Sequence, residues 1–266
     1  MIIDSHIVEE YLAGGPTGRF RDEWCFGGGH PPYAEPEGSE RERVREVYLQ
    51  VLDCAGDFSP VNRAAWDLMF PEWREQTAGV ELLLIVGYPE PYDAVSTKDP
   101  QGGEAIILDM LRWTAYLGHI KEAAENMLTH ELTHALIALR APEVVKDGGR
   151  ADYIKRLDAL AFNEGFAHLL SFKGLDLDRV DWSLPEYAAV WQRSRRRLKE
   201  ALDCRDPGEQ ERLISEGTAG RYFDKFLCMA GMFYLEEIWA REGMEGLERE
   251  FARGHSGFAK RCAGCE

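Results

Sequence analysis

The sequence of 266 residues has no excess of basic side chains and no long apolar run. It carries 47 acidic against 31 basic side chains, a formal net charge of -16, so its average field repels phosphate backbones and anionic headgroups. A membrane-spanning helix needs roughly 20 consecutive apolar residues, and the opening MIIDSHIVEEYLAGG lacks the basic-then-apolar pattern of an export signal. We therefore expect a cytoplasmic protein with neither nucleic acid nor a membrane as a partner.

Cysteine is also scarce. Six residues of this type, at positions 25, 54, 204, 228, 262 and 265, are too few for a disulfide framework in a chain of this length, and we expect them to be reduced. Cys262 and Cys265 form a CxxC with no second pair to complete a structural zinc site. We interpret this pair as part of a mobile tail rather than as a metal site.

The N-terminal part reads as irregular segments, two helices and a small sheet. Residues 1–38, rich in Gly and Pro, are expected to be irregular, and a capping box from Ser39 to Glu42 predicts a helix start. Residues 59–73 read as a shorter helix stopped by Pro71. The apolar runs 79–91 and 102–111, bounded by turn residues, predict two strands.

After Gly118 the pattern is helical almost throughout. Helices are expected over 120–140, over 152–172 with Asp152 as N-cap, over 185–203, and over 219–242 with an end near Gly243. The fold class is therefore α+β, with a small N-terminal sheet and a mainly helical C-terminal lobe. We expect a single domain over 1–266, in which 1–118 holds the sheet and 119–266 the helical part with any metal site.

One motif carries chemistry. THELTHALIAL, residues 129–139, places His130 and His134 four positions apart, so both imidazoles lie on one face of a helix, and Glu131 projects about 100° away. This HExxH pattern suits zinc, because neutral imidazoles bind the ion and a carboxylate base can take a proton from water. The surrounding residues are apolar, and unpaired polar groups in such a helix would cost several kcal/mol.

A catalytic zinc needs a third protein ligand and an open position. Glu164, in ALAFNEGFAHLL, lies on an otherwise apolar stripe of the following helix, so it is a buried carboxylate that needs a cation. Gly165 and Ala167 keep the neighbouring surface small, which would let this helix approach the HExxH helix. We therefore expect Glu164 to face the two histidines.

These residues resemble the gluzincin metallopeptidases, in which HExxH is followed one helix later by a glutamate. GGEAIILDM before the motif is also similar to predicted zinc-dependent proteases of unassigned substrate. The resemblance spans about residues 79–172 and implies a zincin-like fold. It further implies that His130, His134 and Glu164 bind Zn²⁺ and that Glu131 is the general base. An edge strand would then hold the substrate backbone, which points to Ala105 and Ile106.

The chain departs from that family around the glutamate. His168 stands where those enzymes place an aspartate that orients a ligand histidine, and Asp158 and Glu125 are the candidates left for this role. His168 could also replace Glu164 as ligand. For stabilising the oxyanion, Tyr222 is the first candidate beside Tyr234 and His255.

The leading hypothesis is a zinc-dependent hydrolase of peptide or protein substrates. The alternatives are a non-catalytic zinc-stabilised binding domain, in which a fourth ligand such as His168 closes the site, and a zinc hydrolase of a non-peptide amide or ester. The oligomeric state does not follow from the sequence.

Overall fold

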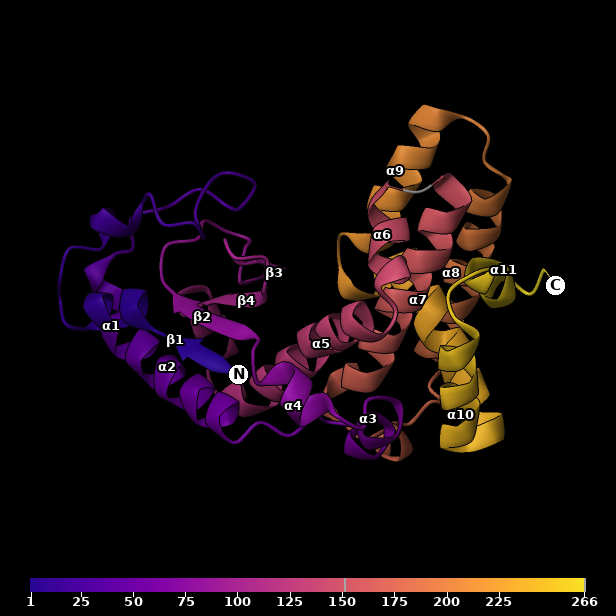
Figure 1. Ribbon diagram of the computed structural model, residues 1–266, viewed down its shortest axis with the longest axis horizontal. Coiled ribbons are helices and arrows are strands. Elements are labelled where there is room, and N and C mark those ends of the chain that lie inside the picture. The colour runs from indigo at the N-terminus through magenta and orange to yellow at the C-terminus, as the bar shows by residue number, and fades with distance from the viewer. Residues whose placement is uncertain (151, 266) are drawn as a thin grey trace. The chain divides into compact units, whose positions relative to one another are not determined.

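The computed structural model describes residues 1–150 and 152–265 and has an α+β fold with a four-stranded sheet and a helical C-terminal part (Figure 1). It separates into two compact units. The first contains Met1–Ser59 and Glu72–Glu131, and the second contains Pro60–Pro71 and Leu132–Glu266. The boundary after Glu131 lies within one helix, Ile120–Arg140, and residues 60–71 belong with the helical unit.

The sheet of the first unit contains β1 (Ile2–Asp4), β2 (Glu81–Ile85), β3 (Ala94–Lys98) and β4 (Glu104–Asp109) in the order β1-β2-β4-β3. β2 pairs in parallel with β1 and β4, whereas β3 pairs antiparallel with β4. Both strands expected from the apolar runs form, as β2 and β4. β1 and β3 were not expected, because edge strands are short and carry no continuous apolar signal.

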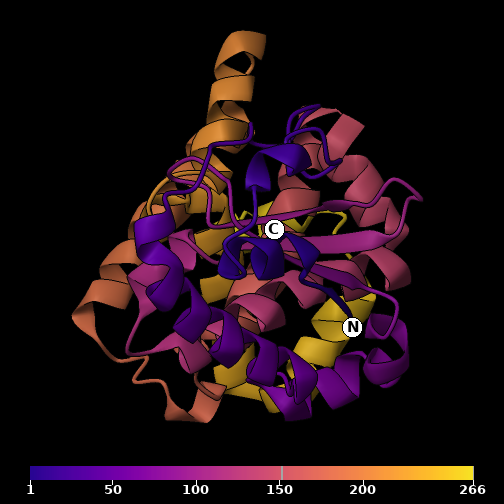
Figure 2. The same ribbon diagram turned by 90° about the vertical axis from the view of Figure 1, so that its left-hand side faces the viewer.

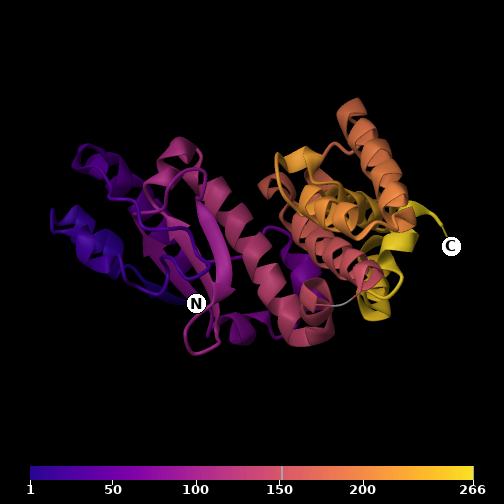
Figure 3. The ribbon, with the colours of Figure 1, turned by 90° about the horizontal axis from the view of Figure 1, so that it is seen from above.

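Helices cover both faces of this sheet. α1 (His6–Leu12) and α2 (Arg41–Gly56) lie on one side, and the N-terminal half of α5 (Ile120–Arg140) lies on the other (Figures 2 and 3). α4 (Trp73–Thr77) precedes β2. The prediction of irregular structure over residues 1–38 is therefore wrong for β1 and α1, in which Ile7, Val8 and Tyr11 are buried.

The expected capping box is also wrong. Ser39 lies in a 3₁₀ turn, Gly38–Glu40, and its hydroxyl is 3.5 Å from the Glu37 carboxylate, while α2 begins at Arg41 without a side-chain cap. The 3₁₀ turn begins before Ser39 and continues directly into the α-helix, so Ser39 is not the residue that flanks the helix start, as the capping box requires. The apolar face of α2 is buried as expected, through Val44, Val47, Tyr48 and Val51.

The second unit is helical. Its helices are α3 (Arg63–Met69), the C-terminal half of α5, α6 (Pro142–Arg150), α7 (Tyr153–Ser171), α8 (Pro185–Asp203), α9 (Pro207–Thr218), α10 (Phe226–Arg253) and α11 (Phe258–Ala263). Asp152 caps α7 as predicted, because its carboxylate accepts the Lys155 N–H. The helix expected over 219–242 starts later, at Phe226, and is broken at Gly243 as predicted, because the φ of 64° there is not helical; a second helical stretch follows it to Arg253.

α7 and α10 cross at two glycines. A methyl group built on Gly231 would lie 2.1 Å from the Ala161 carbonyl oxygen, and one built on Gly165 would lie 2.8 Å from the Gly231 carbonyl carbon. The two backbones are therefore in direct contact, which side chains would prevent. Gly165 was expected to admit the HExxH helix; this is wrong, because the small surface at Gly165 is used by α10.

The C-terminal segment is held by buried polar groups. The Asp158 carboxylate on α7 accepts the backbone N–H groups of Gly257 and Ala259, both at 2.9 Å, and Arg261 donates to the buried Glu250 carboxylate. Cys262 is buried in α11, so the mobile-tail interpretation of the CxxC pair is wrong. All six cysteines are free thiols, and within the described ranges no helix has the length and apolar content to cross a membrane.

Candidate metal centre

The HExxH motif lies in the middle of α5, as its spacing predicts. Leu128, Leu132 and Leu136 are fully buried and fix one face of the helix. Leu139, in the last turn of the helix, is 53% exposed. The motif residues lie where the division into two units falls, between Glu131 and Leu132, but α5 is continuous, so its backbone fixes the spacing of His130 and His134.

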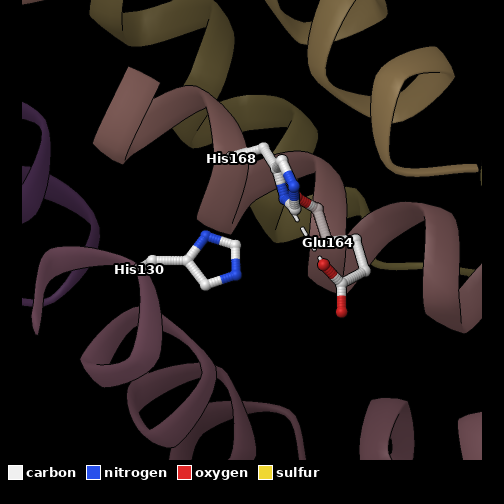
Figure 4. A group of neighbouring side chains, drawn as sticks. All are labelled: His130, Glu164 and His168. Carbon is white, nitrogen blue, oxygen red and sulfur yellow. Dashed lines mark hydrogen bonds and ion pairs between the residues drawn. The ribbon is translucent and has the colours of Figure 1, made fainter. Parts of the chain in front are cut away.

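The structure brings His130, Glu164 and His168 together. One potential ligand atom from each of these side chains lies within 4.8 Å of the others (Figure 4). His130 comes from α5, and the other two come from α7, where they stand one turn apart. Two imidazoles and a carboxylate are ligands that zinc and similar divalent ions prefer. This group can therefore hold a metal ion.

His134 lies beside the same carboxylate, with its Nε2 atom 3.8 Å from Glu164 Oε1. Its Nδ1 atom is 3.0 Å from Asn163 Oδ1. When Nδ1–H donates to this amide oxygen, the lone pair of the ring is on Nε2, the atom nearer to Glu164. Asn163 is thus the residue in contact with the ring of His134, whereas the sequence had suggested Asp158 or Glu125 as the partner of a histidine.

Neither of those two residues orients a ligand histidine. Asp158 accepts the backbone N–H groups of the C-terminal segment, and Glu125 pairs with Lys121 at 3.8 Å. Asn163 directly precedes Glu164 in the sequence, so its position next to a candidate ligand could have suggested a role at the site. An asparagine next to a ligand is nevertheless common for other reasons and could not be assigned a partner without the geometry.

The Glu164 carboxylate has two further neighbours on the second unit. Nδ1 of His168 lies 3.3 Å from Oε2 and 3.0 Å from the backbone carbonyl oxygen of Glu164. The buried thiol of Cys228 on α10 lies 3.6 Å from the same Oε2. Burial, and secondarily the Glu164 charge, raise the pKa of this thiol well above its usual value. No pattern in the sequence indicated that Cys228 lies at this site.

Glu131, the expected base, does not belong to the cluster of three. Its carboxylate accepts a hydrogen bond from the Ser96 hydroxyl on β3, and both residues belong to the first unit. Ser96 is exposed, so the interaction lies at the surface of this unit. The HExxH spacing implies that Glu131 projects away from His130 and His134 and does not itself bind the ion.

The three candidates for stabilising the oxyanion differ in what they contact. The Tyr222 ring lies 5.2 Å from the His168 ring, and 41% of the residue is exposed. The Tyr234 ring packs against Phe258, and His255 pairs with Asp147 at 2.9 Å. Among the described residues, Tyr222 is thus the one of the three with a ring contact to a cluster member.

The expectation of a substrate strand along residues 104–109 is wrong. Ala105 and Ile106 lie on β4, which is paired on both sides, to β2 and to β3. Its backbone groups are occupied and both side chains are buried, so a peptide cannot add to this strand. The edge of the sheet on that side is β3.

No protein-family model, curated protein or solved structure matches this chain. The chemistry of the site therefore rests on its own residues. They provide a His/Glu/His group able to hold a cation, a third imidazole oriented by an amide, and a carboxylate that is outside the group but one residue from His130.

Proposed function

We propose that the protein is a zinc-dependent hydrolase of peptide bonds with a zincin-like arrangement of its site. The observation that carries the proposal is the convergence of His130 with Glu164, from a helix more than 20 residues further along the chain, next to an HExxH motif. His130, Glu164 and one further imidazole, that of His168 or of His134, would hold the ion and leave one position open for water. A zinc ion bound there would lower the pKa of a water molecule and polarise the scissile carbonyl.

The protein's own groups account for the proton transfers. Glu131 takes the proton from the attacking water and passes it to the leaving amine. The Ser96 hydroxyl holds this carboxylate before substrate arrives. The edge strand β3 offers unpaired backbone groups to which an extended peptide can add, and it carries the residue in contact with the base.

The ligand role is tested by metal content. Purified wild-type protein should contain about one zinc per chain, whereas Glu164→Ala should lose most of it, because removal of a ligand leaves an incomplete set. A matched control is Glu125→Gln, a charge removal on α5 outside the site. Wild-type protein without bound metal, or equal metal in the Glu164→Ala variant, would contradict the assignment.

The base role is tested separately. Glu131→Gln should retain the metal and lose hydrolysis of a peptide library by at least about 10²-fold, the usual contribution of general base catalysis. Unchanged hydrolysis would reject Glu131 as the base. Loss of metal in this variant would show that the carboxylate is a ligand instead.

A second candidate follows from His168. Because this imidazole belongs to the group of three and His134 lies next to it, four protein ligands can close the site and leave no position for water. The protein would then be a zinc-stabilised binding domain. This second candidate predicts that His168→Ala weakens metal binding. It also predicts that the wild type hydrolyses neither peptides nor other amides and esters.

A further inference from the structure

The crossing of α7 and α10 places a buried thiol against the carboxylate of the candidate metal centre. Cys228 is fully buried, and its Sγ atom lies 3.6 Å from Glu164 Oε2 and 3.6 Å from the Gly217 carbonyl oxygen at the end of α9. All three residues belong to the second unit. The thiol has one proton, so it donates to one of these two oxygens at a time.

The thiol is not itself one of the clustered ligand atoms. The group whose potential ligand atoms all lie within 4.8 Å of one another contains His130, Glu164 and His168, and Cys228 is not in it, although its sulfur is close to one member. A donor that contacts one oxygen of a ligand carboxylate orients that carboxylate from outside the coordination shell. Such a contact leaves the other oxygen, Oε1, on the side of His134.

The backbone of α7 and α10 fixes this contact. Gly165 directly follows Glu164, and Gly231 lies one turn after Cys228, so the two glycines in contact stand beside the carboxylate and the thiol. Because the helices cannot come closer than backbone contact, the glycine pair sets how near the sulfur lies to Oε2. Packing of α10 and coordination by α7 are thereby linked.

We propose that Cys228 is a positioning residue of the metal centre, which holds the Glu164 carboxylate through an S–H···O hydrogen bond. This inference rests on the proposed metal site but not on peptide hydrolysis. Partners of this kind change metal affinity by roughly 10- to 100-fold when they are removed. The effect should appear in metal binding whether or not a substrate is known.

The experiment measures the zinc dissociation constant of the full chain by competition with a chelator. Cys228→Ala should weaken binding by about 10-fold or more, and Cys228→Ser, which keeps a donor, should stay within a few-fold of the wild type. The matched control is Cys262→Ala, which removes another buried thiol, in α11, and should leave the dissociation constant unchanged.

The outcomes are distinct. Equal zinc affinity of Cys228→Ala and wild type overturns the positioning role and leaves the metal centre intact. Equal weakening by Ala and Ser overturns it as well, because packing and not the donated hydrogen bond would then matter. If the wild type binds no zinc, the proposed function fails together with this inference. Cobalt substitution adds a check: a thiolate charge-transfer band that is present in the wild type and absent from Cys228→Ala would make Cys228 a ligand and so overturn its outer position.

Discussion

Replacement of Gly231 by alanine tests the crossing of α7 and α10 most directly. The added methyl carbon would lie 2.1 Å from the Ala161 carbonyl oxygen, whereas a carbon atom and a carbonyl oxygen in contact are normally about 3.3–3.6 Å apart. The helices must therefore separate by roughly 1 Å, against a tightly packed interior. Overpacking of this kind costs about 1–3 kcal/mol, and we expect Gly231→Ala to lose that much free energy of unfolding.

The assay is urea unfolding, followed by the shift of the midpoint at constant slope. Gly165→Ala should act in the same direction and more weakly, because its methyl carbon would be 2.8 Å from the nearest atom. Gly149→Ala is the control. A methyl carbon built on this glycine in α6 would meet no other side chain or packed backbone within 4 Å, so alanine there should be neutral or stabilise by up to about 1 kcal/mol. Equal stability of the Gly231 and Gly149 variants would refute the direct backbone contact.

Two further predictions concern carboxylates of the second unit, the buried Asp158 and the half-buried Glu236. Asp158→Ala should destabilise the protein by about 1–3 kcal/mol, because it leaves the Gly257 and Ala259 N–H groups without their acceptor; faster hydrogen exchange at these two amides checks it, and unchanged exchange would contradict it. Burial raises the pKa of Glu236 to about 7, so the folded state binds a proton that the unfolded chain releases near its usual pKa of 4.5. This contribution is present at low pH and is lost as the pH rises through 7, so Glu236→Gln should be more stable than the wild type at pH 8 and lose this advantage at pH 5; a difference independent of pH would contradict the shift.

The sequence predicted the long elements well, since they carry a strong periodic signal. α5, α7 and α8 form within one residue of their expected bounds, and Asp152 caps α7 as its position indicated. The short edge strands β1 and β3 were missed because three to five residues of mixed polarity do not distinguish a strand from a loop. Only pairing with a neighbouring strand reveals them.

The site could be predicted to the same extent as the fold: its local features were found and its distant contacts were not. His130 and Glu164 are together as expected, because helix spacing and a buried charge are local properties of the sequence. The partners of these residues are not local. Asn163, Cys228 and Ser96 depend on which helix or strand lies opposite, and the assignment of Gly165 to the wrong neighbour shows that a small residue indicates a close contact without naming the contacting element.

The antiparallel pairing of β3 also makes this part of the chain sensitive to length. Successive side chains of a strand point to opposite faces, so a shift of one residue in the pairing Ser96↔Ile106 would carry the serine hydroxyl to the other side of the sheet and turn Val95 or Thr97 toward Glu131. An insertion or deletion in the connection over residues 86–93 could preserve five paired residues and still replace the serine at the carboxylate, either by the methyl groups of Val95 or by the bulkier side chain of Thr97. Most surface loops tolerate such changes, but this connection has to keep its number of residues.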